Sequence, residues 1–146
     1  MTDFEISDVP VALVARIRGT APITGLPFFF AQAFTRVMTL GVQVTGPPFG
    51  WYHSMPTDTV EVSAGFPVAA GTQPDGEVDV VQRPGGRAVL GLHVGSYDTL
   101  ADTYSELQRW MTDRNLAPRG DMWEEYLTGP DTDPAAARTR IVAPLD

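Results

Sequence analysis

The chain has 146 residues, 43% of them hydrophobic and 19% charged, and its formal net charge is −8. This length and composition predict one globular domain with its own core and argue against a disordered chain. The acidic balance argues against nucleic-acid binding, which depends on clustered Lys and Arg, and the ten basic residues, all arginine, are scattered along the sequence. We therefore expect no direct contact with nucleic acid.

Cysteine is absent, which excludes disulfides, a thiol nucleophile and cysteine metal ligands. The histidines, His53 and His93, lie far apart in the sequence, and neither belongs to a metal-ligand motif. We expect neither a metal nor a cofactor. Asp3 and Glu5 stand where a signal peptide would be basic, and the apolar patch around Phe28 is too short to span a bilayer. We accordingly expect a cytoplasmic protein that does not engage a membrane.

The first half of the chain predicts a strand, a helix and two further strands. Residues 11–18 alternate in polarity, which indicates a half-buried strand. From about residue 24 to residue 40 the apolar side chains recur at helical spacing, and Gly41 is a typical residue to end a helix. A short aromatic strand is expected at residues 49–53, and the regular alternation of residues 60–68 predicts another strand.

The second half begins after a loop rich in small residues, Pro and Gly at residues 69–76, which is the expected hinge between the halves. Residues 77–82 and 88–94 alternate as strands do. A helix is expected from Asp98, a suitable N-cap, to Asn115. Two more strands are expected at residues 123–127 and 139–145.

Both predicted helices carry an apolar stripe, which we interpret as the face that packs on a sheet. In the first helix the stripe consists of Phe30, Phe34, Val37 and Met38. In the second helix it consists of Leu100, Tyr104, Leu107 and Met111, with Trp110 on its flank.

The two halves repeat the same order of elements: strand, helix, aromatic strand with a tyrosine, turn, and strand. The two tyrosines are Tyr52 and Tyr126. We predict a single domain over residues 1–146, built from pseudo-repeats at about residues 4–70 and 77–146. Two such β-α-β-β units predict an α+β fold with a mostly antiparallel sheet, two helices on one face, and a ligand cleft between the repeats.

The second half resembles the GyrI-like superfamily, the effector-binding domains of bacterial multidrug-responsive transcription activators and their free-standing relatives. The segments that carry the resemblance are residues 91–97, Tyr104, Trp110, residues 123–127 and residues 141–145. The first half agrees more loosely, through residues 46–49, Tyr52 and residues 66–68. The order and spacing of the segments span nearly the whole chain and indicate a free-standing member with a tandem-repeat fold.

The resemblance implies a site around Glu124. In the family, lipophilic and often cationic or planar aromatic ligands lie between the repeats against a buried glutamate, two positions before the strand tyrosine. Here these residues are Glu124 and Tyr126, which strand alternation places on one side, with Trp123 and Glu125 on the other. We interpret Glu125 as solvated. A carboxylate buried alone is costly, so such a pocket favours a cation, tyrosine hydroxyls and aromatic faces.

The candidate ligand-binding residues are Glu124, Tyr126, Tyr52, Trp51, Phe66, Tyr97, Trp110 and Trp123. For each aromatic side chain among them, an ordinary place in the core is an equally good interpretation, because large aromatics dominate cores as well as pockets.

Three functions remain open. The first is binding of a lipophilic, cationic or aromatic small molecule. The second follows from free-standing relatives that hydrolyse reactive cyclopropane compounds: Glu124 with Tyr126 or Tyr52 would then act as base and acid. The third is a protein-interaction module of the gyrase-inhibitor type, in which the acidic chain meets a basic partner. We expect a role in transcription to require a separate DNA-binding partner.

Overall fold

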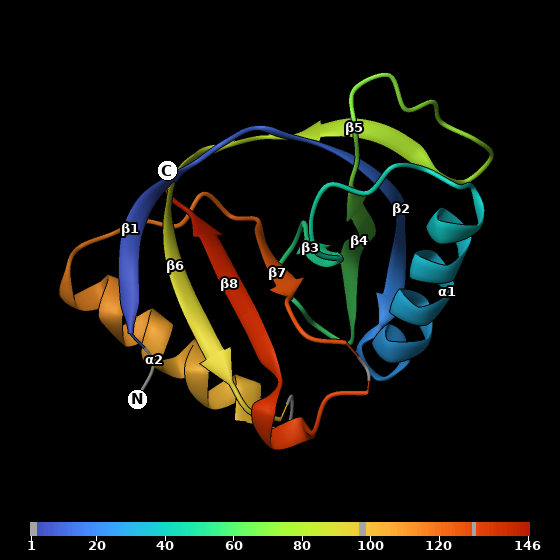
Figure 1. Cartoon of the computed structure of the whole chain (residues 1–146). Helices are drawn as coiled ribbons and strands as arrows, with labels where there is room; N and C mark the ends of the chain where they lie inside the picture. The colour runs from blue at the N-terminus through green and yellow to red at the C-terminus, as the bar shows by residue number, and fades with distance from the viewer. Residues whose placement is uncertain (1–2, 97–98, 130) are drawn as a thin grey trace.

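The computed structural model of the chain describes residues 3–96, 99–129 and 131–146. It consists of one eight-stranded sheet and two α-helices (Figure 1). The strands are β1 (Phe4–Val9), β2 (Ala12–Pro22), β3 (Phe49–Tyr52), β4 (Thr59–Pro67), β5 (Asp79–Arg83), β6 (Gly86–Val94), β7 (Met122–Tyr126) and β8 (Arg138–Pro144). The helices are α1 (Leu26–Thr39) and α2 (Leu100–Asp113), with single 3-10 turns at Ile23–Gly25 and Pro134–Ala136.

The predicted α+β class is confirmed. The strand order is β1-β6-β8-β7-β3-β4-β2-β5, and each strand pair in the described part of the chain is antiparallel. The strands β3 and β7 pair in the middle of the sheet, so the two repeats join there side by side. An additional strand that the alternation did not predict, β1, forms one edge of the sheet.

Both helices lie on the same face of the sheet, which we call the outer face. On this face α1 packs Val37 against Ala15 of β2, and α2 packs Leu107 against Val89 of β6 and Ile141 of β8. Within the described residues, neither helix is long and apolar enough to cross a bilayer.

The predicted helix ends are largely confirmed. Gly41 follows α1 with a φ of 69°, and Asn115 follows α2 with a φ of 55°, the left-handed conformation that commonly ends helices. Pro27 lies in the first turn of α1, where a missing N–H does no harm. The predicted N-cap of the second helix, Asp98, lies outside the described residues.

The two repeats exchange their outermost strands. The strand β1 continues past Pro10 into β2 but pairs with β6 of the second repeat, and β5 pairs with β2 of the first repeat before the chain continues into β6. Together these two long segments form an arch over the sheet (Figure 1). Gly85 lies where they cross, and a side chain there would come within 2.2 Å of the Val9 carbonyl oxygen, so only glycine fits.

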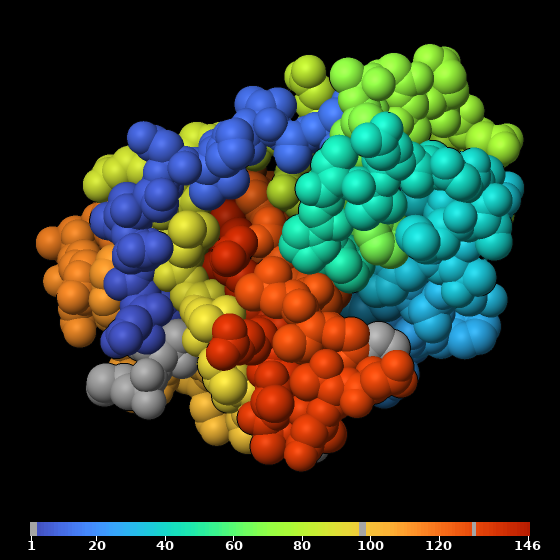
Figure 2. Space-filling view, viewed as in Figure 1, coloured from blue at the N-terminus to red at the C-terminus, as the bar shows by residue number. Residues whose placement is uncertain are grey.

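The opposite, inner face of the sheet is also buried, because the sheet curls under this arch. Its core cluster contains Val14, Phe49, Trp51, Ala88, Trp123 and Val142. The space-filling view shows this side of the molecule hollowed between β1 and the segment that follows α1 (Figure 2). The sheet is therefore packed on both faces. The face to which a strand residue points decides which of the two cores it belongs to.

Candidate functional site

The pairing of β3 with β7 decides which candidate residues share a face. Gly50 lies directly opposite Glu124, and Trp51 lies directly opposite Trp123. Opposed residues on antiparallel strands point to the same side of the sheet, and neighbours along a strand alternate. Glu124, together with Tyr126 two positions later, therefore points to the outer face under the helices. The paired tryptophans point to the inner face.

Glu124 is 4% exposed, and its carboxylate accepts hydrogen bonds from two tyrosines. Tyr126, on the same strand, donates its hydroxyl to Oε1 at 2.8 Å. Tyr104 reaches down from α2 and donates to Oε2. A third tyrosine, Tyr52 of β3, lies close enough to the same carboxylate for each group to shift the pKa of the other. The site thus joins a strand from each repeat with a helix of the second.

The electrostatics of this group follow from its burial. Burial raises the pKa of Glu124, and the hydrogen bonds from Tyr104, Tyr126 and Tyr52 oppose that rise because they stabilise the charged form. Burial and the charge of Glu124 in turn raise the pKa of all three tyrosines, so they remain hydrogen-bond donors at neutral pH. Among the described residues, no arginine or histidine lies within ion-pair distance of this carboxylate.

Aromatic rings from α1 cover the carboxylate and its tyrosines. The Phe30 and Phe34 rings lie 6.0 Å and 6.3 Å from the Tyr126 ring, measured between centroids. Phe30 also lies 6.4 Å from Tyr52, and Phe66 of β4 lies 5.5 Å from Phe34. These edge-to-face and tilted contacts are the arrangements that aromatic rings prefer.

Gly50 provides the space in which these rings meet the carboxylate. A side chain at Gly50 would come within 2.8 Å of the Tyr126 hydroxyl and 2.9 Å of the Phe30 ring. The absence of a side chain opposite Glu124 therefore lets both rings approach the sheet. In the described conformation the region is filled by these aromatics, so a ligand would enter only if some of them moved.

The candidate residues that the structure describes fall into three groups. Glu124, Tyr126 and Tyr52 lie together, and Phe66 joins them through Phe34. Trp51 and Trp123 lie on the inner face, in the core cluster with Phe49.

Trp110 lies at the far side of α2, 5.9 Å from the Phe4 ring and with the Arg114 guanidinium 3.9 Å above it. It therefore packs at the sheet edge rather than beside Glu124. Tyr97 lies outside the described residues.

Three residues that lie around Glu124 and Tyr126 are not among the candidates from the sequence: Tyr104, Phe30 and Phe34. Tyr104 was interpreted as part of the apolar stripe of the second helix, and the phenylalanines as core. The available signal was a hydroxyl within an otherwise apolar stripe, because a buried tyrosine hydroxyl needs a partner.

Glu125 differs from the expectation of a solvated residue. Its side chain is largely buried and pairs with Arg140 at 3.0 Å and with Arg83 at 3.7 Å. Arg83 lies in the arch, with its guanidinium 4.2 Å above the Trp123 ring. The curl of the sheet, which brings β5 over β7, explains why this carboxylate is enclosed.

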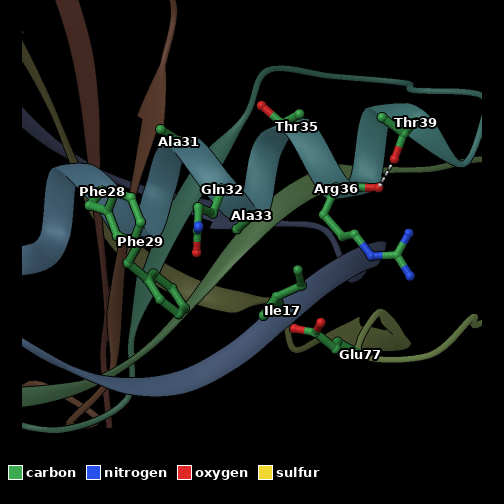
Figure 3. A pocket seen from close by; sticks show the side chains of 10 residues that line it. All are labelled: Ile17, Phe28, Phe29, Ala31, Gln32, Ala33, Thr35, Arg36, Thr39 and Glu77. Carbon is green, nitrogen blue, oxygen red and sulfur yellow. Dashed lines mark hydrogen bonds between the residues drawn. The ribbon is translucent and has the colours of Figure 1, made fainter.

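A surface hollow of about 620 Å³ lies elsewhere, along α1 and over Ile17 of β2 (Figure 3). The rings of Phe28 and Phe29 line one end of it and Arg36 the other, and Glu124 is not part of it. Within residues 3–96, 99–129 and 131–146, no three potential metal-ligating side chains come together. The groups gathered around Glu124 are a carboxylate, tyrosine hydroxyls and aromatic rings.

Comparison with known proteins agrees with the fold. The family model described as the GyrI-like small molecule binding domain matches residues 2–146. No curated protein sequence matched the chain. Among solved structures, the EcmrR C-terminal domain superposes with a TM-score of 0.89 at 20% identity, over 100% of this chain and 98% of that one. In the EcmrR–DNA complex, this chain spans 57% of the EcmrR chain, at a TM-score of 0.86 and 22% identity.

Two further structures share the fold at lower identity. SAV2435, solved bound to tetraphenylphosphonium, has a TM-score of 0.77 and 10% identity, with 99% of this chain and 94% of that one covered. A protein described as a hydrolase from Listeria innocua has a TM-score of 0.68 and 16% identity, with 98% and 91% covered. At these identities the likeness concerns the fold.

Proposed function

This chain belongs to the GyrI-like small molecule binding domain family, and on that premise we propose that it binds lipophilic organic cations against Glu124. One observation carries the proposal: the Glu124 carboxylate is buried and hydrogen-bonded, and no cationic side chain of the described residues pairs with it. A buried charge without a partner is costly. A ligand cation would supply the missing charge.

The rings around Glu124 suit the apolar part of such a ligand. Tyr52, Tyr126, Phe30 and Phe34 present faces and edges close to the carboxylate. Aromatic faces attract cations, and the attraction grows when water is excluded. SAV2435, bound to the lipophilic cation tetraphenylphosphonium, supports the proposal as a protein of the same fold.

Entry of a ligand requires α1 aromatics to swing away from the sheet. Phe30 is the side chain nearest to Gly50 besides the Tyr126 hydroxyl, so it would have to rotate first. Rotamer changes at a binding site are common even where the backbone moves little.

Calorimetric titration with tetraphenylphosphonium tests the proposal. Glu124→Gln removes the charge and is expected to weaken binding about 10-fold to 100-fold, the effect of losing one charge-assisted contact of ~1.5–3 kcal/mol. Glu125→Gln is the matched control, because it alters the neighbouring carboxylate on the opposite face, and it should leave the affinity unchanged. Equal affinities for wild type and Glu124→Gln would refute the proposal, as would equally tight binding of the uncharged triphenylphosphine oxide.

A second candidate, hydrolysis of reactive cyclopropane compounds, is favoured by the proton donors around Glu124. A carboxylate whose pKa is raised by burial is a stronger base, and Tyr126 or Tyr52 would donate a proton. Product analysis by mass spectrometry after incubation with such a compound tests it. Conversion by wild type that Glu124→Gln abolishes is expected, and unchanged substrate with wild type would rule this candidate out.

A further inference from the structure

A second polar cluster lies on the inner face, on the opposite side of the sheet from Glu124. It is built around Arg16 of β2, which is 8% exposed. Its Nη1 donates to the Ser63 hydroxyl at 3.2 Å, and its Nε has no hydrogen-bond partner among the described residues. The guanidinium lies 5.4 Å above the Trp51 ring. Arg16 is therefore a buried cation that lacks an ion-pair partner within the described chain.

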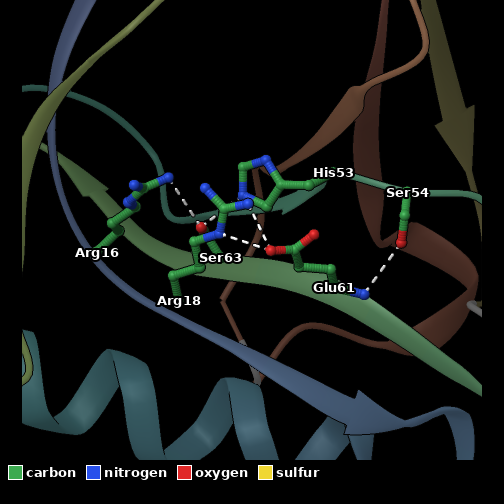
Figure 4. A network of polar contacts seen from close by, with 6 residues as sticks. All are labelled: Arg16, Arg18, His53, Ser54, Glu61 and Ser63. Carbon is green, nitrogen blue, oxygen red and sulfur yellow. Dashed lines mark hydrogen bonds and ion pairs between the residues drawn. The ribbon is translucent and has the colours of Figure 1, made fainter.

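Two further nitrogen-bearing side chains converge on the same point (Figure 4). The His53 ring lies 4.4 Å from the Trp51 ring, and its Nε2 is 2.7 Å from the Ser63 hydroxyl. Arg18, two positions along β2, pairs with Glu61 of β4. The cluster thus holds two arginines and one imidazole.

We propose that Arg16, Arg18 and His53 form a binding site for an oxyanion, such as the carboxylate of an organic acid or a sulfate or phosphate group. The free Nε of Arg16 belongs to the edge of the guanidinium that grips such groups with two parallel hydrogen bonds. Trp51, below Arg16 and beside His53, would contact a planar substituent of the anion.

The pair formed by Arg18 and Glu61 lies beside this site and is open to solvent. Both side chains are about two-fifths exposed, 43% and 44%. Exposed ion pairs contribute little, so an incoming oxyanion would displace Glu61 from Arg18 at small cost. Removing the Glu61 charge would accordingly strengthen anion binding.

The pKa of His53 reflects the charges that surround its ring. Burial, followed by the positive charges of Arg18 and Arg16, lowers the pKa of His53 to about 4, and Glu61 and Asp121 act in the opposite direction. A bound oxyanion would add a negative charge beside the ring and raise that pKa. The groups that act on His53 belong to β2 and β4 and to Asp121, which precedes β7, so we expect this effect to be independent of a ligand at Glu124.

Imidazole NMR of the full chain tests the site directly. The chain has two histidines, so His93, on the outer face next to Thr103, serves as the internal control. A pH titration is recorded with sulfate, with benzenesulfonate, or with sodium chloride at equal ionic strength. Sulfate and benzenesulfonate keep their charge throughout. We expect either oxyanion to raise the His53 pKa by about one unit relative to chloride, the lower range for an opposite charge nearby, and to leave His93 unchanged.

Four variants make the outcome decisive. Arg16→Gln should abolish the oxyanion effect, and Arg18→Gln, which alters an exposed side chain and should preserve the fold, should weaken it. Glu61→Gln should lower the sulfate concentration needed for half of the effect. Glu124→Gln should leave the oxyanion effect on His53 intact, which separates this site from the cation site. The proposal fails if wild type and Glu61→Gln show no oxyanion effect, if Arg18→Gln retains it in full, or if Glu124→Gln removes it.

Discussion

Tyr126→Phe measures how strongly the buried carboxylate depends on its donors. The change removes one hydroxyl, whose oxygen lies 2.8 Å from Oε1 of Glu124, and leaves the ring contacts with Phe30 and Phe34 in place. A hydrogen bond to a charged group contributes ~1.5–3 kcal/mol. We therefore expect the free energy of unfolding to fall by about 2 kcal/mol, which corresponds to a decrease in Tm of roughly 4–8 °C for a chain of this size.

Urea unfolding followed by tryptophan fluorescence provides the measurement, because Trp51 and Trp123 are buried probes. The control is Tyr126→Phe in a Glu124→Met background, where the hydroxyl has already lost the Glu124 carboxylate and keeps its contact with Tyr52. There the tyrosine change should cost clearly less than in the wild-type background, so that the two effects are non-additive. A loss below ~0.5 kcal/mol in the wild-type background, or an equal loss in both backgrounds, would refute the hydrogen-bond explanation.

Three further predictions concern pH, ligand entry and the sheet. Burial raises the folded-state pKa of Glu124, so between the unfolded value of about 4.3 and the raised folded value the folded chain holds a proton that the unfolded chain releases. Stability should fall as pH rises through that range, and urea titrations of Glu124→Gln should lack that decrease. Gly50→Ala should crowd the Tyr126 hydroxyl and weaken tetraphenylphosphonium binding in calorimetry, whereas Gly129→Ala, with open space around it, should not. Gly65→Ala should destabilise by more than ~4 kcal/mol in urea unfolding, since its Cβ would overlap a backbone carbonyl, while Gly129→Ala stays within ~0.5 kcal/mol.

The regular sheet was predictable because alternation is a local property. The strand at residues 60–68 and the pairing of Glu124 with Tyr126 on one side both follow from a period of two, and β4 and β7 confirm them. The edge strand β1 was not predicted because its alternation of polar and apolar residues is weak. Glu5 and Ser7 face the inner side, and Ile6 remains partly exposed.

The division of the aromatics between two faces was harder to predict. Alternation already places Trp123 and Glu124 on opposite faces of the sheet. The expectation of a single ligand cleft nevertheless grouped Trp51 and Trp123 with Glu124 as candidate ligand-binding residues. An open sheet with helices on one face would leave its other face to solvent. Here the arch closes over that face, so the tryptophans fill a second core. Tyr104 depends on the docking angle of α2, which no local pattern encodes.

The exchange of β1 and β5 makes each repeat incomplete by itself. A fragment ending near residue 70 would contain β1 without its partner β6, and the remaining fragment would contain β5 without β2. Each would expose an unpaired strand edge that fits the other, so the two fragments should assemble when mixed and aggregate when kept apart. The same exchange should slow folding, because the strands that pair at the two edges lie 63 to 87 residues apart in the sequence. We therefore expect that neither half folds by itself.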